Sequence, residues 1–333
     1  MNARWWDIEH AVDHPAVRVM LLMVAGLLVG AGVIIGVLSV LGKLKSEMRT
    51  ELIRRTVAWG VMVPVVVGPI LIAPAWGGLM MGVVSLLCYR EFARATGLFR
   101  EKALSALVAV SIGVITFSVV DHWYGFFMAL GPLSIVVILA AATLRDEPKG
   151  YIQRIGLASL AVLLFGVCLG HAGYLCNDGT YRPMVLLLLA CVGLNDIFAF
   201  CCGKLIGGAK LAPTTSPGKT ISGAVGAITL TTVTFVVLGS MVFTAGPLSQ
   251  MHHLIVMGIM VSTAGILGDL TISSVKRDIG IKDMGVVIPG HGGVLDRCNS
   301  LLLTAPAFFH YVGYFQGVGL DTPTRVISGG LGP

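Results

Sequence analysis

Residues 253–299 read HLIVMGIMVSTAGILGDLTISSVKRDIGIKDMGVVIPGHGGVLDRCN. The first part, residues 253–274, contains a single carboxylate and is long enough to cross the hydrocarbon of a bilayer. The second part, residues 273–299, gathers four cations, three carboxylates, one histidine and five glycines. This stretch therefore predicts a membrane helix that leads directly into a polar site.

The composition of the whole chain places it in a membrane. Of its 333 residues, 56% are apolar and only 12% are charged, whereas soluble domains carry about 25% charged residues. The 43 glycines fit closely packed membrane helices. An apolar soluble α/β enzyme is excluded by the length of the apolar runs. We expect an all-α, polytopic integral membrane protein with about ten transmembrane helices and short loops.

Ten apolar runs are candidate spans. They cover residues 18–41, 56–73, 75–89, 103–120, 124–143, 155–175, 183–202, 221–245, 253–274 and 299–318. Pro69 and Pro74 lie around the junction of the second and third runs, which form either a hairpin or one broken element. Residues 1–17 predict an interfacial amphipathic segment, with a frayed terminus as the alternative. Residues 18–333 form one transmembrane domain without a linker or an internal repeat.

The distribution of basic residues predicts the topology. If the loop after the first span is cytoplasmic, alternation of ten spans places 19 of the 23 lysines and arginines on that side. Both termini then lie on the opposite side, and segments 195–223 and 273–299 face the cytoplasm, where nucleotides are available. The compact loops favour a bacterial inner membrane. The scattered basic residues argue against a nucleic-acid partner.

The seven cysteines do not form a disulfide framework, because no CxxC pair occurs and most lie in or beside apolar runs. We expect buried free thiols. Vicinal Cys201 and Cys202 have no neighbouring residues that complete a metal-ligand set.

Two carboxylates, Asp196 and Asp269, lie in apolar helices. A charge at the bilayer centre costs roughly 2.5–3.5 kcal/mol, so such residues usually face a polar cavity; the alternative is a carboxylate that snorkels at a helix end. If the helix of Asp269 continues, Ser273 and Lys276 follow at i+4 and i+7 on the same face. Arg277 then lies about 100° round the helix, where it can reach a second anion.

Oxygen ligands without a His/Cys cluster indicate Mg²⁺. Asp269 and Asp296 form the best pair, Asp283 and Asp196 are further candidates, and a second cation is left open. The turn at residues 289–293 has room for a phosphate to approach the backbone. His291 is equally a substrate contact or a structural hydrogen-bonding residue. The turn Ser216–Thr220 suits a phosphate, although it lacks the P-loop pattern.

The polar stretch resembles the signature of the CDP-diacylglycerol synthases, also called phosphatidate cytidylyltransferases: S-x-x-K-R, four residues, K-D-x-G, then P-x-H-G-G, two residues and D-R-x-D. The matching residues are Ser273, Lys276, Arg277, Lys282, Asp283, Gly285, Pro289, His291, Gly292, Gly293, Asp296 and Arg297. Upstream, the pair Asn195-Asp196 and the motif S-P-x-K-T (Ser216, Pro217, Lys219, Thr220) are also similar to the family. The resemblance covers about residues 190–310.

Two carboxylates of the family pattern are missing. The last aspartate of the signature is Asn299, preceded by Cys298, and a glutamate common after S-P-x-K-T is Ser222. These departures bear on metal affinity, nucleotide choice and activity.

The resemblance implies transfer of CMP from CTP to phosphatidate, with release of pyrophosphate. It implies Mg²⁺ on Asp269 and Asp296, with Asp196 as a further ligand. CTP and phosphatidate are the expected partners, and a homodimer is left open. The expected catalytic residues are Lys276, Arg277, Lys282, Asp283, His291 and Arg297. The expected substrate-binding residues are Ser216, Lys219, Thr220, Ser273, Gly292 and Gly293.

Three alternatives stay open. A CTP-using enzyme that acts on another lipid phosphate, including a CTP-dependent lipid kinase, would need similar groups, and Asn299 and Ser222 favour it. A secondary transporter would also have intramembrane aspartates, but it would place them near the midplane and show repeats. An inactive paralogue is the third alternative.

Overall fold

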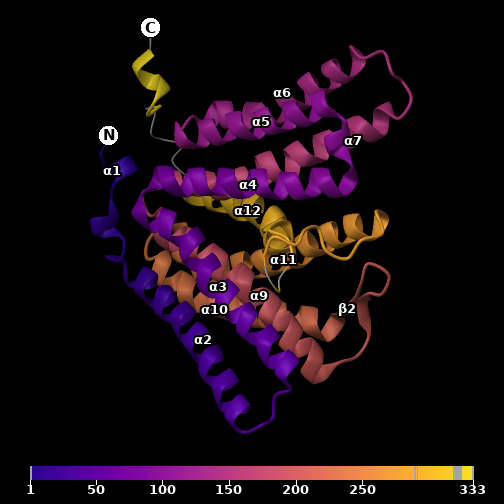
Figure 1. Ribbon diagram of the computed structural model, residues 1–333. Coiled ribbons are helices and arrows are strands. Elements are labelled where there is room, and N and C mark those ends of the chain that lie inside the picture. The colour runs from indigo at the N-terminus through magenta and orange to yellow at the C-terminus, as the bar shows by residue number, and fades with distance from the viewer. Residues whose placement is uncertain (1, 289, 291, 318–324, 332–333) are drawn as a thin grey trace.

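The computed structural model of the protein describes residues 2–288, 290, 292–317 and 325–331. Ten long helices fill this described part of the chain (Figure 1). They are α2 (Pro15–Val40), α3 (Ser46–Ile72), α4 (Pro74–Thr96), α5 (Lys102–Val120), α6 (Tyr124–Thr143), the helix Tyr151–Asn177, α9 (Tyr181–Ile206), α10 (Ile221–Val242), α11 (Met251–Asp278) and α12 (Leu295–Gln316). The helix Tyr151–Asn177 consists of α7 (Tyr151–Ala161), the π-helical segment η3 (Val162–Cys168), α8 (Leu169–Tyr174) and η4 (Leu175–Asn177).

The remaining elements are short. They are α1 (Asn2–Trp5), η1 (Ile8–His10), η2 (Leu98–Arg100), η5 (Pro247–Ser249), η6 (Ser328–Leu331) and the strands β1 (Lys210–Ala212) and β2 (Ser216–Thr220). The two strands form an antiparallel hairpin in which Lys210 pairs with Thr220 and Ala212 with Ser216. The all-α membrane fold is therefore confirmed, with one small hairpin that the sequence did not predict.

Eight of the long helices are apolar and long enough to cross a membrane within the described residues; α4 and α12 are not among them. The count of ten spans thus stays a prediction. Several helices continue beyond the predicted spans. Helix α3 begins ten residues before the predicted position 56, and α4 continues to Thr96, beyond the predicted end at 89. Charged residues do not end a helix, and α4 stops only at Gly97, whose φ of 78° leaves the helical region.

Helices α3 and α4 are separate elements. Ala73 between them is extended, with φ −170° and ψ 163°, as the residue before a proline tends to be. Pro74 then occupies the first turn of α4, where a missing N–H costs nothing. Pro64 and Pro69 both remain inside α3.

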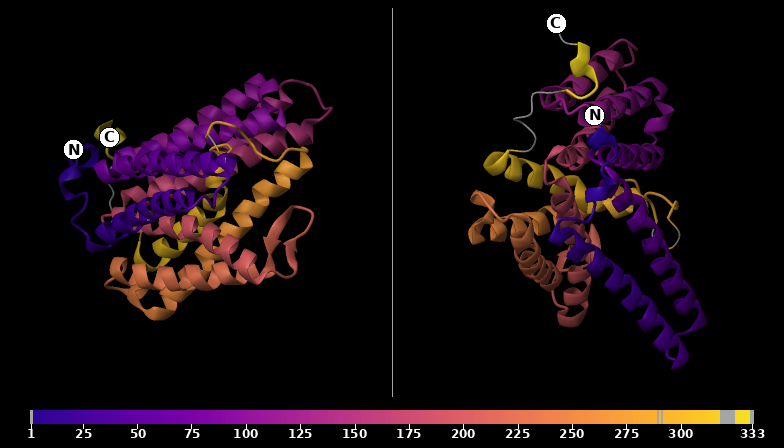
Figure 2. Two further views of the ribbon diagram at one scale, coloured as in Figure 1. Left: turned by 60° about the horizontal axis from the view of Figure 1, so that its bottom comes forward. Right: turned by 90° about the vertical axis from the view of Figure 1, so that its left-hand side faces the viewer.

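Helix α12 lies centrally in the bundle (Figures 1 and 2). It contacts α4 and α8 on one side and α9 and α11 on the other, and its side chains Leu302, Ala305 and Phe308 are fully buried. Helices α2 and α3 instead project from the bundle (Figures 1 and 2). The buried residues of α2 all lie near its start, and the one buried residue of α3 is Ile70, near its end. The helical hairpin of α2 and α3 therefore joins the bundle mainly where α2 begins and α3 ends.

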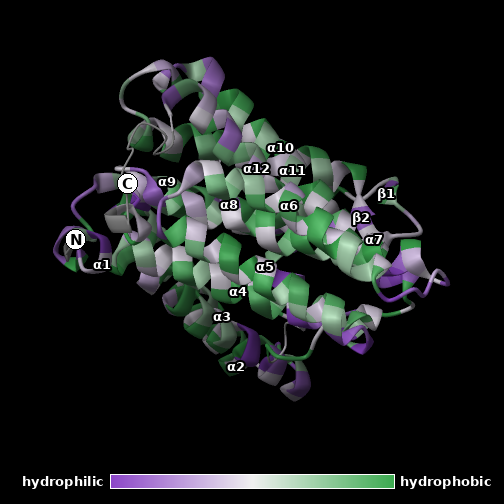
Figure 3. Cartoon of the chain, turned by 90° about the horizontal axis from the view of Figure 1, so that it is seen from above, coloured by the Kyte–Doolittle hydropathy of each residue, from purple (hydrophilic) through white to green (hydrophobic). Residues whose placement is uncertain are grey.

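Both ends of the chain lie at one end of the molecule, and the β-hairpin lies at the other, with the apolar helices between them (Figure 3). The N-terminal segment is docked on the bundle: the Arg4 guanidinium donates to the carbonyl of Val120 at 3.0 Å, and Asp7 pairs with Arg182 at 2.9 Å. The shared position of the ends agrees with the predicted alternation. Which membrane side each end faces stays a prediction.

All seven cysteines are free thiols. Cys88, Cys168, Cys176 and Cys191 are buried, as predicted. The prediction of burial was wrong for Cys201, which is exposed on α9, and Cys202 beside it is only half-buried. An apolar run indicates that a residue lies in the bilayer, and such a residue faces either the protein interior or the lipid.

Two glycines allow the helices around the polar end to approach closely. A Cβ on Gly223 of α10 would lie 2.6 Å from the carbonyl oxygen of Ala199 on α9. A Cβ on Gly268 of α11 would lie 2.6 Å from the carbonyl oxygen of Asn299 on α12. The second contact lies next to Asp269 and sets how near its carboxylate comes to α12.

Candidate active site

The two polar segments that the sequence singled out meet at one end of the bundle. Lys219 of β2 pairs with Asp269 of α11, with 2.5 Å between Nζ and Oδ2. Arg277, near the end of α11, donates from Nε to the carbonyl of Thr215 in the turn of the β-hairpin at 3.2 Å. Segments 195–220 and 269–297 therefore face each other at this end of the bundle.

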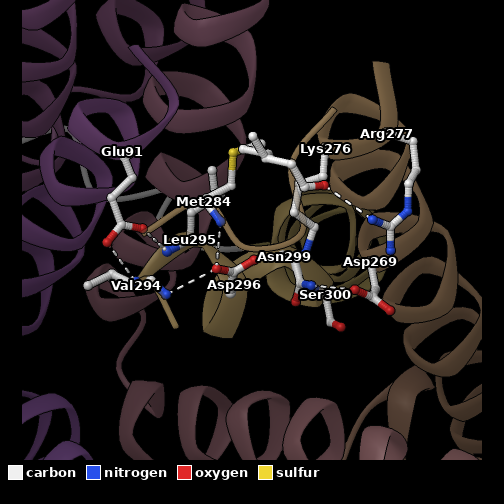
Figure 4. A network of polar contacts seen from close by, with 12 residues as sticks. Glu91, Asp269, Lys276, Arg277, Met284, Val294, Leu295, Asp296, Asn299 and Ser300 are labelled. Atoms are coloured by element: carbon white, nitrogen blue, oxygen red, sulfur yellow. Dashed lines mark hydrogen bonds and ion pairs between the residues drawn. The ribbon is translucent and has the colours of Figure 1, made fainter. Parts of the chain in front are cut away.

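The predicted polar face of α11 exists. The helix continues to Asp278, so Asp269, Ser273 and Lys276 lie on one helical face. Ser273 and Lys276 are buried. The ammonium of Lys276 donates to Asp296 Oδ1 at 2.8 Å (Figure 4). This buried ion pair joins the end of α11 to the first turn of α12.

Asp296 organises the polar loop between the two helices. Its second oxygen, Oδ2, accepts the backbone N–H groups of Met284 at 2.9 Å and Gly293 at 3.0 Å (Figure 4). Together with Lys276, three donors therefore converge on one buried carboxylate. Such an arrangement fixes the loop against the start of α12.

Glu91 on α4 is a site residue that the sequence reasoning missed. Its buried carboxylate accepts the N–H groups of Val294 at 3.0 Å and Leu295 at 2.9 Å. These are orphan donors at the start of α12, where a negative charge is favourable. A Cβ on Gly293 would lie 2.2 Å from Glu91 Oε2, so the glycine leaves room for the carboxylate. The available signal was a carboxylate directly after an apolar run, in a helix that continues.

A second cluster of polar side chains surrounds Asp269. The side-chain amide of Asn299 donates to Asp269 Oδ1 (Figure 4). Ser300 Oγ lies 3.4 Å from Asp196 Oδ1. Asp196 interacts electrostatically with Asp269, Lys219 and Arg297. Asp196 and Asp269 thus share one environment, whereas Asp296 has the separate partners described above.

Asn195, next to Asp196, holds the helices behind this site. Its Oδ1 accepts the hydroxyls of Thr231 on α10 at 3.2 Å and Ser262 on α11 at 2.5 Å. Buried polar bonds of this kind tie membrane helices together. Asn195 therefore fixes the spacing of α9, α10 and α11 below the carboxylates.

The other predicted residues have varied positions. Thr220 caps α10, because its hydroxyl accepts the N–H of Gly223 at 3.0 Å. The carbonyl of Gly292 accepts the N–H of Ile288 at 2.9 Å. Lys282, Asp283 and Arg297 are exposed around the site. Ser216 begins β2. His291 lies outside the described residues, as does Pro289.

Ser222 has a structural contact. Its hydroxyl donates to the carbonyl of Gly207 and lies 3.0 Å from Thr220 Oγ1. These bonds close the base of the β-hairpin against α10. Neither Ser222 nor Asn299 is left unpaired where the family pattern has a carboxylate.

Among the described residues, no group of three or more His, Cys, Asp or Glu side chains forms a ready-made metal cage. Asp196 and Asp269 form one acidic pair. Asp283 and Asp296 form another, because a Cβ on Gly292 would lie 3.0 Å from Asp296 Oδ2 and 3.6 Å from Asp283 Oδ1. Mg²⁺ usually takes one or two protein carboxylates and completes its shell with water and phosphate oxygens, so a pair is sufficient.

The model of the cytidylyltransferase family matches residues 53–315. The chain belongs to this family. The match runs from α3 to α12 and is wider than the predicted 190–310. It makes the chain a nucleotidyltransferase that uses CTP and is embedded in the membrane.

Curated relatives in the family include an uncharacterized protein, YnbB, of Escherichia coli (strain K12), with 30% identity over 77% of this chain and 85% of that protein. A phosphatidate cytidylyltransferase of Rickettsia bellii is 40% identical over 43% of this chain and 63% of that enzyme. The phosphatidate cytidylyltransferase of Bacillus subtilis is 30% identical over 58% of this chain and 73% of that enzyme.

Proposed function

We propose that this cytidylyltransferase transfers CMP from CTP to phosphatidate, giving CDP-diacylglycerol and pyrophosphate. The observation that carries the proposal is the meeting of Lys219, Asp269 and Lys276 at one polar end of a membrane bundle. The named activity of the Rickettsia and Bacillus relatives supports the same acceptor. A lipid substrate also accounts for a site built between membrane helices.

The cations suit a triphosphate and a lipid phosphate. Lys219, Lys276 and Arg277 lie on facing elements, with exposed Lys282 and Arg297 beside them. In the observed state Lys219 is paired with Asp269 and Lys276 with Asp296. A phosphate between them would compete for both ammonium groups. These residues therefore bind and orient anionic substrates in a region of reduced solvent.

Mg²⁺ fits the acidic pair, because hard oxygen ligands of two adjacent carboxylates and the Ser300 hydroxyl match its preference. We propose that Asp269 and Asp196 hold it, and Asp296 remains a third candidate. When bound, the cation supplies neutralisation of phosphate charge. For Asp269 to become a ligand, its bonds to Lys219 and Asn299 must loosen, which frees Lys219 for the substrate.

The reaction needs no strong general base, since a phosphatidate oxygen is already anionic. That oxygen forms a bond to the α-phosphorus of CTP, the bond from this phosphorus to the bridging oxygen breaks, and pyrophosphate leaves with the electron pair. We propose that Lys276, Arg277 and Lys219 hold the phosphates in line. Asp283 and His291 stay within the predicted site without an assigned step.

The proposed site faces the cytoplasm of a bacterial inner membrane. Support comes from the alternation of ten spans, which places 19 of the 23 lysines and arginines on the side of this site. At that side the site has access to CTP, and the acyl chains of the acceptor can stay in the bilayer.

A second acceptor is favoured by Asn299 and Ser222, which replace two carboxylates of the family pattern and are built into the fold by their own hydrogen bonds. In that case the same site uses CTP with a different lipid phosphate.

The test is product identification. Detergent-solubilised protein is incubated with Mg²⁺, CTP labelled in the α-phosphate, and one lipid phosphate at a time. The proposal predicts labelled CDP-diacylglycerol with phosphatidate. A labelled product only with another lipid phosphate would move the function to the second acceptor.

A further inference from the structure

Arg54 and Arg55 of α3 lie beside Gly290, in the loop between α11 and α12. A Cβ built on Gly290 would lie 3.3 Å from Cγ of Arg55 and 3.6 Å from Cδ of Arg54. On its other side, the same loop lies against Asp296, because a Cβ on Gly292 would lie 3.0 Å from Asp296 Oδ2. Gly290 therefore lies beside α3 and Gly292 beside the first turn of α12, and α3 borders the site.

A groove of about 520 Å³ runs between this end of α3 and the loop. It is lined by Ser46, Glu47, Thr50, Glu51, Arg54 and Gly290. Arg54 is the only cation among these lining residues. The groove thus has one side chain suited to bind an anion.

The two arginines differ in their partners. Arg55 is paired with Glu51, one turn earlier on α3. Arg54 has no hydrogen bond or ion pair with any residue in the described part of the chain. Its guanidinium is exposed and offers a planar set of donors that matches phosphate oxygens.

The face of α3 above Arg54 is apolar and open to the bilayer. Val57, Val61 and Val65 follow at i+3, i+7 and i+11, so they share a helical face with Arg54. Each has more than half of its surface exposed. From Arg54 to Val65 the helix rises about 16 Å. An acyl chain along this stripe would carry its head group at the level of Arg54.

The groove beside Arg54 is accessible from the bilayer on the side of α3 that carries these valines. Near Arg54, helix α3 has no buried residue, since its single buried residue is Ile70 at the far end. The α2–α3 hairpin also leans away from the bundle (Figure 2). A lipid can therefore reach the groove beside Arg54 without the displacement of a buried side chain of α3.

We propose that Arg54 binds the phosphate of the lipid acceptor as that lipid comes in along α3 from the bilayer. This inference rests on the proposed transfer of CMP to a lipid phosphate. The nucleotide instead binds on the opposite wall, near Lys219 and Asp269. Arg54 is thus a substrate-binding residue that specifies a lipid phosphomonoester.

The test measures KM for each substrate separately in the Arg54→Ala variant. We expect KM for phosphatidate to rise roughly 10- to 100-fold, the usual effect of losing a charged hydrogen bond, with KM for CTP unchanged. Arg54→Lys should recover part of the loss, because the charge remains without the planar donors. A rise in KM for CTP alone, or no change in either constant, overturns the proposal.

The matched control is Arg49→Ala. Arg49 lies on the same helix, is exposed and carries the same charge. It is five residues before Arg54 and therefore faces about 140° away. The control should leave both KM values unchanged. An equal effect of Arg49→Ala would indicate a general surface charge effect and would overturn the assignment to Arg54.

A binding measurement separates this inference from the proposed reaction. Retention of labelled phosphatidate in mixed micelles by the purified protein is measured without CTP, with phosphatidylcholine as the lipid that lacks a phosphomonoester. We expect wild type and Arg49→Ala to retain phosphatidate and Arg54→Ala to lose that retention. Equal retention by Arg54→Ala and wild type would overturn the inference, whether or not CDP-diacylglycerol is formed.

Discussion

The side-chain amide of Asn299 donates a hydrogen bond to the carboxylate of Asp269 and so joins α12 to α11. Where the family pattern has an aspartate, this chain has a donor that partly satisfies the neighbouring carboxylate. The Asp269 carboxylate therefore has two partners, the side-chain amide of Asn299 and the ammonium group of Lys219. An aspartate at position 299 would add a third carboxylate to Asp196 and Asp269.

The first prediction concerns this position. In Asn299→Asp the donor is lost and like charges meet, so we expect a loss of about 1–3 kcal/mol of stability in the presence of a chelator. Added Mg²⁺ should then raise the midpoint of thermal unfolding more than in wild type, because the extra carboxylate binds the cation. Asn299→Ala removes the donor without a new charge. The same Mg²⁺ response in both variants would contradict the prediction.

The second prediction concerns Asp269 itself. Asp269→Asn keeps the size of the side chain but removes the charge that faces Lys219. We expect kcat/KM to fall at least about 100-fold, with the midpoint of thermal unfolding nearly unchanged. Asp278→Asn, at the exposed end of α11, is the control with the same change of charge. Wild-type turnover in Asp269→Asn would rule out a metal role for this residue.

The third prediction concerns Glu91. Glu91→Ala leaves the N–H groups of Val294 and Leu295 without an acceptor, at a cost of about 2–4 kcal/mol. Glu91→Gln keeps one acceptor oxygen and should lose less. Thermal unfolding in detergent should therefore rank wild type above Glu91→Gln and Glu91→Ala lowest. An alanine variant as stable as wild type would show that Glu91 does not hold the start of α12.

The fourth prediction concerns the pH dependence of a contact at the end of the molecule opposite the candidate active site, where residues 325–331 dock on Asp121. Burial of Asp121 would raise its pKa, but the hydrogen bonds from Ser328 and from the N–H of Ile327, with the charge of Arg325, hold that pKa below its usual value of 3.8. Docking of residues 325–331 on Asp121 is thus at full strength above about pH 4. It weakens as the pH falls below 3.8 and is lost below the depressed pKa.

Hydrogen exchange of the amides of residues 327 and 328, expressed as protection factors, measures this docking. Protection should fall as the pH is lowered through that range in wild type. Asp121→Asn should show weak protection at every pH. Protection in wild type that does not change between pH 6 and pH 3 would contradict the role of Asp121.

Local spacing was sufficient to predict part of the site. The i, i+4, i+7 spacing placed Asp269, Ser273 and Lys276 on one face, because a helix fixes such neighbours whatever surrounds it. Glu91 lies 203 residues before Val294 along the chain, so no spacing rule connects the two. The same reason hid the position of Arg54 beside Gly290 at one groove.

Hydropathy predicted all ten long helices but not all their ends. Apolar runs mark the part of a helix inside the bilayer, whereas α3 and α4 continue as helices through charged residues such as Arg54 and Glu91. Glu91, which the sequence reasoning missed, and Arg54, to which we assign the proposed lipid contact, both lie in these polar extensions. A search of helix extensions beyond apolar runs would have found them.

The most direct test of the proposed reaction follows the two ends of the triphosphate. Purified protein receives phosphatidate, Mg²⁺ and CTP labelled either in the α- or in the γ-phosphate. Transfer of CMP predicts that the α-label enters the lipid product and that the γ-label leaves in pyrophosphate. The γ-label in the lipid would identify a lipid kinase, and no labelled lipid with either CTP would contradict phosphatidate as the acceptor.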